Sequence, residues 1–489
     1  MKPDEREAVV KQAYDVVIVG SGIAGIAAAN TLAGHGLDIL VIDENPHAGG
    51  QILRQNCRVT DGFWEFDPRL GRSGRTVSTR NIVESLRPVR RPRGITCVHQ
   101  ARVLGIFPDR QLLVHVPDPL CPGGSGPGCV LEIEAGYMLL ATGARERFLP
   151  FKGWTLPGVM SLGAAQILMK SSGILPARNT LISGTSPLQT VLALEILKNK
   201  GKVTAVLDET HLTKKLGLLP LLKHHWTLAG EGAMQMLCLL IRQVRFRQGV
   251  RVVEARGKNE LTAAVTTGLD RNGNTVPGTF QTYSAKALAV GHGFCPNIEL
   301  SVQAGCDLDY EADRGGWVVR VDTALETSVS AVYAAGEITG IAGAGKSFVE
   351  GKLAAVSILE KMGEKLGQEM CVQELIRIQK QQLGYAAFLN QLCQMPSSAY
   401  ETIDDDVLIC RCEEISMGEI RKQISKGFVT AGSLKKATRC GMGRCQGRIC
   451  QPVLFDIILA LTGQTPEQTG SPSSRAPVKN VPMAAFLHP

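Results

Sequence analysis

The stretch YDVVIVGSGIAGIAAANTLAGHGLDILVID, residues 14–43, decides the fold of the first part of the chain. Residues 15–19 form an apolar run typical of a buried strand, an alanine-rich helical segment follows the glycines, and residues 38–43 predict a second strand. The glycines keep the spacing G-x-G-x-x-G between strand and helix, and an acid closes the second strand. This is the full context of a dinucleotide-binding fold rather than a lone glycine motif.

The residues of this motif have separate predicted roles. Gly20 permits a tight turn, Gly22 lets the backbone approach a pyrophosphate, and Gly25 lets the helix pack closely on the strand. Asp43, with Glu44 as the alternative, would bind the adenosine ribose. Glycines that serve packing alone are the competing interpretation, which so complete a match disfavours.

Residues 154–290 predict a second domain of the same type, inserted into the first. Residues 179–208 have the same strand–helix–strand pattern, but the glycine motif there reads G-T-S-P-L-Q and keeps only its first glycine, Gly184. Side chains at Ser186 and Gln189 would obstruct the pyrophosphate and the contact between helix and strand. We therefore expect that NAD(P)H is not a hydride donor here, although an adenine nucleotide could still bind for structural reasons.

A second decisive segment is rich in cysteine, with five of the chain's 14 cysteines in 41 residues. They form a C-x-C pair, a spacer long enough for two short helices, and then two consecutive C-x4-C spacings: Cys410, Cys412, Cys440, Cys445 and Cys450. Thiolates from two segments suit either zinc or an iron–sulfur cluster. Nine Lys and Arg residues against three Glu residues in this segment favour the negatively charged cluster. Unligated cysteines or a disulfide are the remaining alternative.

Three further segments resemble, in the expected order, the flavin-binding motifs of flavoproteins with two dinucleotide-binding domains. These segments read GGQI, LLATGAR and AVYAAGE, from residues 49, 139 and 331. The resemblance implies an α/β, glutathione-reductase-like fold with FAD as the cofactor. It also implies these contacts: Gly50, Gln51, Thr142, Gly143, Gly336 and Glu337. Glu337 stands where the family usually has Asp, so its carboxylate is one methylene further from the backbone.

The sequence GIAGAGKS, residues 340–347, also matches the Walker A pattern of nucleotide-hydrolysing proteins. We reject that interpretation because the motif directly follows a flavin-type strand, and no strand with a terminal Asp follows in a suitable place. We predict instead a glycine-rich turn and a helix over residues 348–361 whose N-terminus faces the flavin.

The cysteine segments, CRCEE and TRCGMGRCQGRIC, resemble the bacterioferritin-associated-ferredoxin-like (BFD-like) [2Fe-2S] domain found at the C-terminus of several flavin dehydrogenase subunits. This resemblance implies that the ligands are Cys410, Cys412, Cys445 and Cys450, which makes Cys440 a spare. A competing assignment takes Cys440 together with Cys445, so the fourth ligand is open.

Over nearly its whole length the chain is similar to the FAD-containing alpha (A) subunits of bacterial opine oxidase, hydrogen cyanide synthase and D-hydroxyproline or proline dehydrogenase complexes. It is also related to the alpha subunit of heterotetrameric sarcosine oxidase. The resemblance implies an electron-transfer subunit of a dehydrogenase that oxidises the C–N bond of an amino acid, imino acid or opine. It implies no catalytic acid or base in this chain.

The same resemblance implies a set of partners. They are a D-amino-acid-oxidase-like beta subunit, a small ferredoxin-like subunit, an FMN at the contact between subunits, and an external electron acceptor. The alternative function is a stand-alone NAD(P)H-dependent ferredoxin-type reductase, which would need an intact second glycine motif.

Composition and pattern set the remaining expectations. A net charge of +8 without a basic stripe gives nucleic-acid binding little support. The charged N-terminus and the absence of an apolar run as long as about eighteen residues predict a cytoplasmic protein. The expected domains are residues 1–153 and 291–365 (FAD-binding), 154–290 (inserted, NAD-like), 366–405 (linking helices), 406–464 ([2Fe-2S]) and 465–489 (flexible tail).

Overall fold

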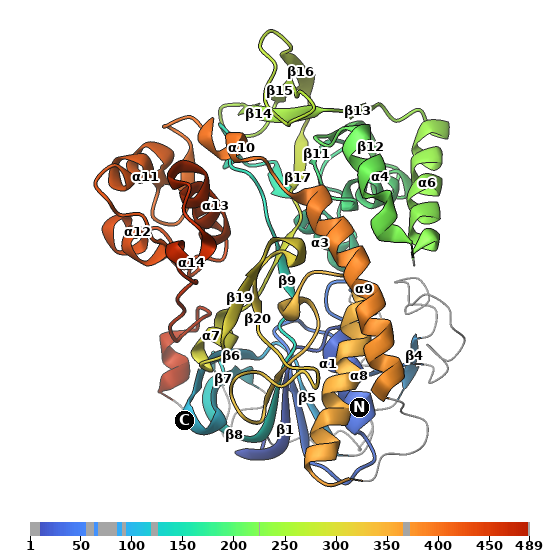
Figure 1. Cartoon of the computed structure of the whole chain (residues 1–489), viewed down its shortest axis with the longest axis vertical. Coiled ribbons are helices and arrows are strands. Elements are labelled where there is room, and N and C mark those ends of the chain that lie inside the picture. Colours follow the sequence, from blue (N-terminus) through green and yellow to red (C-terminus); the bar gives the residue numbers. More distant parts are fainter. Residues whose placement is uncertain are drawn as a thin grey trace.

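The computed structural model describes residues 10–54, 63–66, 86–89, 94–118, 126–223, 225–364 and 372–487. Two sheet-containing domains lie one above the other, and a small helical domain lies beside the inserted one (Figure 1). No helix in the described ranges is long and apolar enough to cross a membrane, and the cytoplasmic location stays a prediction.

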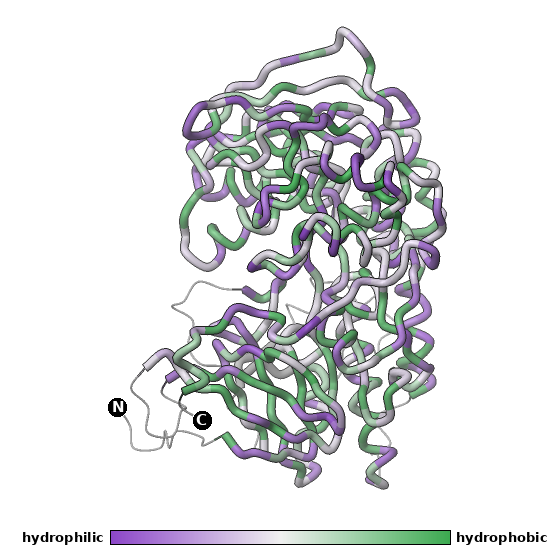
Figure 2. Tube along the Cα trace, turned by 90° about the vertical axis from the view of Figure 1, so that its left-hand side faces the viewer, coloured by the Kyte–Doolittle hydropathy of each residue, from purple (hydrophilic) through white to green (hydrophobic). Residues whose placement is uncertain are grey.

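The first domain is built on a seven-stranded sheet whose central strands are parallel. Across the sheet the strands are β5 (Ile95–Val98), β2 (Ile39–Ile42), β1 (Ala13–Val19), β8 (Cys129–Leu140), β7 (Gln111–Val116) and β6 (Arg102–Phe107), and β21 (Val332–Ala334) pairs with the end of β8. Strands β6 and β7 are antiparallel to their neighbours, so the sheet ends in a hairpin. The apolar strands run through the interior of the molecule (Figure 2).

Helices α1 (Ile23–Leu32) and α8 (Ala344–Lys361) pack against each other beside this sheet, with α9 (Val372–Cys393) outside them (Figure 1). Glycine makes the close approach possible. A Cβ on Gly351 would lie 2.1 Å from the carbonyl oxygen of Ala24. Helix α8 begins earlier than the predicted residue 348.

The inserted domain is entered through β9 (Ala144–Glu146) and left through β18 (Phe294–Pro296), which pair in antiparallel fashion. Its parallel sheet has the order β10 (Val159–Ser161), β17 (Ala287–Gly291), β11 (Asn179–Gly184), β12 (Lys202–Asp208) and β13 (Phe246–Gln248). Its helices are α3 (Leu162–Ser172), α4 (Leu188–Lys198), α5 (Leu212–Leu218) and α6 (Trp226–Ile241). The predicted strand–helix–strand unit over residues 179–208 is therefore present as β11, α4 and β12.

Smaller elements complete these two domains. They are the antiparallel sheet of β14 (Val250–Arg256), β15 (Ala263–Gly268) and β16 (Gln281–Ser284), the pairs β19 (Leu308–Glu311) with β20 (Gly316–Val319) and β3 (Phe63–Phe66) with β4 (Leu86–Val89), and helix α7 (Glu299–Gln303).

The cysteine-rich domain follows α9 and the short α10 (Ser397–Glu401). It consists of β22 (Leu408–Cys410), β23 (Ile415–Ser416), α11 (Met417–Ile424), α12 (Ala431–Thr438), α13 (Cys450–Thr462) and α14 (Pro466–Thr469). Helices α11 and α12 fill the spacer between the cysteine segments, as the sequence predicts. Both begin with a capping box.

The cysteine-rich domain shares one apolar core with the inserted domain. Trp154 joins the two, because its indole Nε1 donates a 2.7 Å hydrogen bond to the carbonyl oxygen of Leu408 and the guanidinium of Arg411 lies 5.1 Å from its ring centre. A second link is buried: Arg147 Nη1 lies 3.6 Å from Asp456 Oδ2, which also accepts a 2.9 Å hydrogen bond from the Tyr400 hydroxyl. The cysteine-rich domain is therefore fixed to the rest of the chain.

The expectation of a flexible tail over residues 465–489 is wrong for the part described, which ends at residue 487. Val478 is 2% exposed and its N–H donates a 2.8 Å hydrogen bond to the carbonyl oxygen of Leu104, and Ala485 is fully buried. The turn-rich composition of this segment concealed the few apolar side chains that hold it on the first domain.

We expect Trp154→Phe to weaken the attachment of the cysteine-rich domain by about 1–2 kcal/mol, because the Leu408 carbonyl loses its partner. Chemical denaturation followed by circular dichroism measures the change. Trp317→Phe is the matched control, since the buried Trp317 Nε1 has no hydrogen-bond partner among the described residues. An equal loss of unfolding free energy in Trp154→Phe and Trp317→Phe would contradict this role of Trp154.

Candidate functional site

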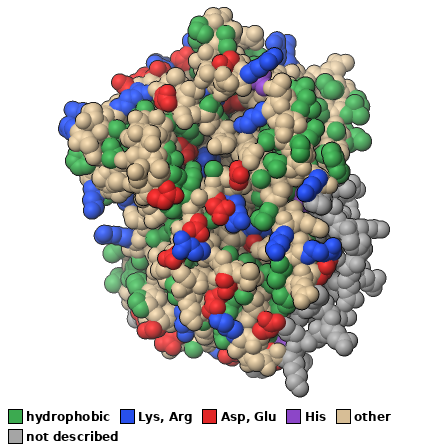
Figure 3. Space-filling view, in the orientation of Figure 1, with side chains coloured by type: hydrophobic (Ala, Val, Ile, Leu, Met, Phe, Trp, Pro, Cys, Tyr) green, Lys and Arg blue, Asp and Glu red, His purple; other side chains and the backbone are tan. Residues whose placement is uncertain are grey.

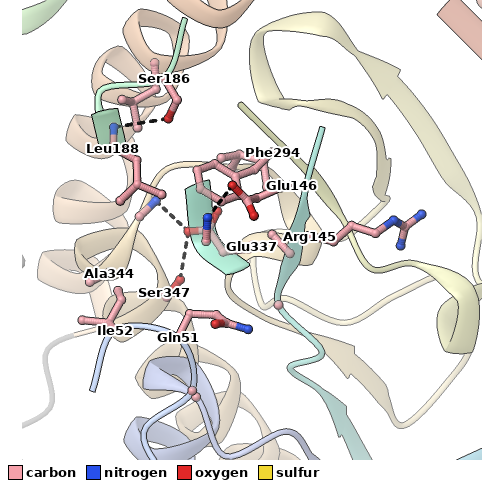
Figure 4. A pocket seen from close by; sticks show the side chains of 18 of the residues that line it. Gln51, Ile52, Arg145, Glu146, Ser186, Leu188, Phe294, Glu337, Ala344 and Ser347 are labelled. Atoms are coloured by element: carbon pink, nitrogen blue, oxygen red, sulfur yellow. Dashed lines mark hydrogen bonds between the residues drawn. The ribbon is translucent and has the colours of Figure 1, made fainter. Parts of the chain in front are cut away.

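A cavity of about 1760 Å³ lies between the first domain and the inserted domain. It is larger than the roughly 300–1,000 Å³ of a typical small-ligand site. Figure 4 shows side chains from both domains facing it. The predicted flavin contacts that line it are Gly20, Gly22, Asp43, Glu44, Gly50, Gln51, Thr142, Gly143, Gly336 and Glu337.

The first glycine motif forms a backbone cradle at one side of the cavity. A Cβ on Gly20 would lie 2.3 Å from the carbonyl oxygen of Ala141, and one on Gly25 would lie 1.9 Å from that of Gly20. Gly22 and Gly50 face each other, because a Cβ on Gly50 would lie 2.8 Å from Gly22 Cα. Helix α1 starts here without a capping side chain. Its N-terminus therefore suits the diphosphate of a dinucleotide.

The two acids predicted to bind ribose have different surroundings. Asp43 is buried, and its Oδ2 accepts hydrogen bonds from the N–H of Ser21 (2.6 Å) and the Ser21 hydroxyl (2.7 Å). Its Oδ1 accepts two more from Asn45, both 2.8 Å long. Glu44 is half exposed and forms a 2.5 Å ion pair with Lys479. Asp43 thus holds the glycine loop in place, and the ribose contact of either acid stays a prediction.

Glu337 turns back toward the start of α8. Its Oε1 accepts a 2.6 Å hydrogen bond from the N–H of Gly343, and its Oε2 accepts a 3.3 Å one from Ala342. Burial raises the pKa of Glu337, although Lys346 and the two amides oppose the rise. Figure 4 shows Glu337 beside Ser347 in the cavity. The longer side chain, compared with Asp, lets the carboxylate reach the helix N-terminus.

Lys346, the lysine of the Walker-like sequence, is buried away from the cavity. Its ammonium lies 2.8 Å from Glu350 Oε2 and donates to the carbonyl oxygen of Gly336 (2.8 Å) and to the Thr339 hydroxyl (2.5 Å). A lysine with these partners is not available to a phosphate, which agrees with rejecting the hydrolase interpretation.

In the inserted domain, the backbone amides that follow the glycine motif already have hydrogen-bond partners within the chain. Ser186 Oγ accepts a 3.3 Å hydrogen bond from Leu188 N–H, and Gln189 N–H donates to the Ser186 carbonyl oxygen at 3.1 Å. Pro187, between them, has no N–H to offer. The first amides of α4 are thus occupied within the chain, and a diphosphate would have to displace Ser186 to reach them (Figure 4).

Gln189 and the acid that ends β12 also have their polar groups paired within the chain. Gln189 is buried, and its side-chain amide donates a 3.3 Å hydrogen bond to the carbonyl oxygen of Leu207 in β12. Asp208, the acid at the end of β12, is paired with Lys215. These contacts support the expectation that the inserted domain does not hold NAD(P)H as a hydride donor.

Arg145, Glu146 and Glu299 are charged residues of the cavity that the sequence prediction did not name as contacts. Arg145 Nη1 forms a 2.6 Å ion pair with Glu299 Oε1 and donates to Asn297 Oδ1 at 2.9 Å. Glu146 Oε1 accepts a 2.8 Å hydrogen bond from Gly163 N–H, and burial raises the pKa of Glu146. The only sequence signal for Arg145 and Glu146 is their place directly after the ATG segment.

The structure brings all five cysteines to one place. The sulfurs of Cys410, Cys440 and Cys450 lie within 4.8 Å of one another, and all three residues are buried. Cys412 is exposed and is hydrogen-bonded to Cys445, through both the backbone and the side chain of Cys445. Cys440, predicted to be a spare, therefore lies within 4.8 Å of both Cys410 and the predicted ligand Cys450.

The surroundings of Cys410 suit a thiolate. Hydrogen bonds from the Cys440 and Cys450 thiols and from the N–H groups of Gly441 and Glu413 hold the pKa of Cys410 far below its ordinary value. A group of thiolates supplied with amide donors is the environment of an iron–sulfur cluster. The residues present thus fit the [2Fe-2S] cluster that the sequence predicts.

The cysteine loop also reaches the large cavity. Arg448, between Cys445 and Cys450, lines that cavity together with Arg145 and Glu299. Burial lowers the pKa of Arg448, and the attraction of Glu299 opposes this effect. Arg145 interacts electrostatically with Cys445 across the same boundary. The loop that carries candidate cluster ligands therefore forms part of the wall of the candidate flavin cavity.

Comparison with known proteins agrees with both sites. Residues 14–360 match the pyridine nucleotide-disulphide oxidoreductase family, and residues 408–459 match the BFD-like [2Fe-2S] binding domain. An opine oxidase subunit from Agrobacterium tumefaciens (strain Ach5) is 30% identical, over 97% of this chain and 92% of its own length. Hydrogen cyanide synthase subunit HcnB from Pseudomonas aeruginosa is 30% identical, over 96% of this chain and 97% of its own.

Among solved structures, L-proline dehydrogenase from P. horikoshii superposes with a TM-score of 0.65 at 20% identity, covering 97% of this chain and 79% of that one. The matches confirm the predicted fold class and two of the predicted cofactors, FAD and a [2Fe-2S] cluster. The FMN and the adenine nucleotide stay predictions.

We predict that Cys450, rather than Cys440, is the fourth cluster ligand. Cys450 is the first residue of α13, and the N-terminus of a helix favours negative charge. Cys450→Ala should lose the cluster, and Cys440→Ala should keep it, by iron and acid-labile sulfide analysis. Cys306→Ala, a buried cysteine of the first domain, is the control. Cluster kept in Cys450→Ala and lost in Cys440→Ala would reverse the assignment.

Proposed function

We propose that this chain, an FAD-dependent oxidoreductase that belongs to the pyridine nucleotide-disulphide oxidoreductase family, is the electron-transfer subunit of a multi-subunit dehydrogenase. The complex would oxidise the C–N bond of an amino acid, imino acid or opine, of the proline, hydroxyproline, glycine or opine class. Relatives named as subunits of opine oxidase and hydrogen cyanide synthase support this assignment.

One observation carries the proposal: Arg448 of the cysteine loop lines the same cavity as the predicted flavin contacts. When bound, FAD exchanges electrons in pairs or singly and a [2Fe-2S] cluster takes one at a time, so the two together convert a two-electron input into single electrons. The chain's own part is to carry both sites, with the cysteine loop in the wall of the flavin cavity. Arg145, Glu299 and Arg448 fill the boundary between them.

The residues assigned to each cofactor are part of this proposal. The FAD contacts are Gly20, Gly22, Gly25, Asp43, Glu44, Gly50, Gln51, Thr142, Gly143, Gly336 and Glu337. The cluster ligands are Cys410, Cys412, Cys445 and Cys450. Among these, the glycines give the diphosphate access to backbone amides, and the acids and Thr142 order the loops around it. We keep the domain boundaries of the sequence prediction, apart from the tail.

An exposed apolar face supports association with another chain. Helix α6 presents Trp226, Met234, Leu237, Leu240 and Ile241 to solvent, with exposed fractions from 49% to 72%. Figure 3 shows apolar side chains gathered over this helix, at the upper right. Patches of this kind mark interaction sites. The partners that we propose are the D-amino-acid-oxidase-like beta subunit, with an FMN at the contact, the small ferredoxin-like subunit and an external electron acceptor.

The alternative, a stand-alone NAD(P)H-dependent ferredoxin-type reductase, has less support. It needs free amides at the start of α4, where Ser186 accepts one hydrogen bond and Pro187 lacks a donor. The described part of the chain also brings no pair of cysteines to the large cavity, so a disulfide-reductase cycle has no dithiol there.

We expect NADH to reduce the bound FAD at least about 100-fold more slowly than the partner subunit does, because two or more charge-assisted hydrogen bonds to its diphosphate are missing. Anaerobic stopped-flow mixing, which follows the loss of flavin absorbance, measures both rates. Rapid and saturable bleaching by NADH would favour the stand-alone reductase.

We further expect the purified chain alone not to oxidise proline, hydroxyproline, glycine or an opine, and co-expression with its partner subunit to supply that activity. The physical reason is that the predicted flavin contacts already line the large cavity between the two domains. Dye-linked assays of the chain and of the complex test this. Turnover by the chain alone would overturn the assignment as an electron-transfer subunit.

A further inference from the structure

Residues 474–480, here called the strap, cross from the cysteine-rich domain to the edge of the first sheet. At the sheet edge, the N–H of Val478 donates to the carbonyl oxygen of Leu104 in β6 (2.8 Å), and Arg102 Nη1 donates to the carbonyl oxygen of Asn480 (3.1 Å). Gly105 makes room for the strap, because a Cβ there would lie 2.9 Å from the Cβ of Ala476. The strap is thus fitted to this edge.

The strap is also a wall of the large cavity. Val478 and Lys479 line it together with Arg102 and Glu44. The Lys479 ammonium lies 2.5 Å from Glu44 Oε2. This is the end of the cavity where the acids after β2 are predicted to meet the adenosine ribose. Because a diphosphate carries negative charge, a cation that neutralises Glu44 favours its binding.

The cluster loop holds the strap from the other side. Arg448 Nη1 donates a 2.6 Å hydrogen bond to the carbonyl oxygen of Val478. Arg448 is two residues before Cys450, so the same loop that carries a cluster ligand also supports the wall of the flavin cavity. The backbone of Val478 is therefore bound to both domains at once.

We propose that the strap is part of the FAD site: Val478 and Lys479 close its adenosine end, and the ion pair of Lys479 with Glu44 retains the cofactor. FAD then leaves only when the strap lifts from β6. Retention of the cofactor by the strap does not depend on which substrate the complex oxidises.

The test compares rates of FAD release after dilution, read as the rise in flavin fluorescence, with cluster absorbance recorded in the same sample. Because an exposed ion pair contributes roughly 0.5–1 kcal/mol, Lys479→Met should release FAD about two- to fivefold faster. Lys286→Met is the matched control, because it breaks an exposed pair with Glu260 away from the cavity. Release from Lys479→Met at the wild-type rate would overturn the proposal.

A second measurement does not depend on any variant. Hydrogen–deuterium exchange is compared for the FAD-loaded chain and for the chain freed of FAD. A peptide over residues 474–480 should exchange faster without FAD, while a peptide over α11 should not change. If the peptide over residues 474–480 exchanges at the same rate with and without FAD, that result would also overturn the proposal.

Discussion

The contact between the segment just after β9, residues 147–154, and the cysteine-rich domain fixes the candidate flavin site relative to the candidate cluster site. Arg145 and Arg147 lie on the two sides of Glu146: the first faces the flavin cavity and the second pairs with Asp456 of α13. A buried ion pair of this kind fixes the relative position of the two domains more than it adds net stability, because desolvation offsets much of the attraction. Trp154 and the shared apolar core supply the stability.

The two glycine motifs show how one framework supports different chemistry. In the first, Gly22 and Gly50 leave the start of α1 open, and no side chain caps it. In the second, Ser186 and Pro187 occupy or remove the amide donors at the start of α4. The first domain can therefore take a dinucleotide, whereas the inserted domain shares its apolar core with the cysteine-rich domain. Under the proposed function, electron input comes from another chain.

Local patterns were predictable from the sequence, and long-range contacts were not. The strand–helix–strand units are set by apolar periodicity and glycine spacing within about 30 residues, and both were found where predicted. The direction of Glu337, the ion pair of Arg145 with Glu299 and the docking of Val478 join residues far apart in sequence or depend on side-chain reach. Cys440 illustrates the same limit, since spacing alone does not reveal that its sulfur lies beside those of Cys410 and Cys450.

Under the proposed function, electrons pass between FAD and the [2Fe-2S] cluster within this chain. Rapid freeze-quench electron paramagnetic resonance tests this transfer most directly, after anaerobic photoreduction of the flavin in the purified protein. The proximity of Arg145, Glu299 and Arg448 predicts that the reduced-cluster signal grows in step with the loss of reduced-flavin absorbance. A cluster that stays oxidised while the flavin stays reduced would contradict the account.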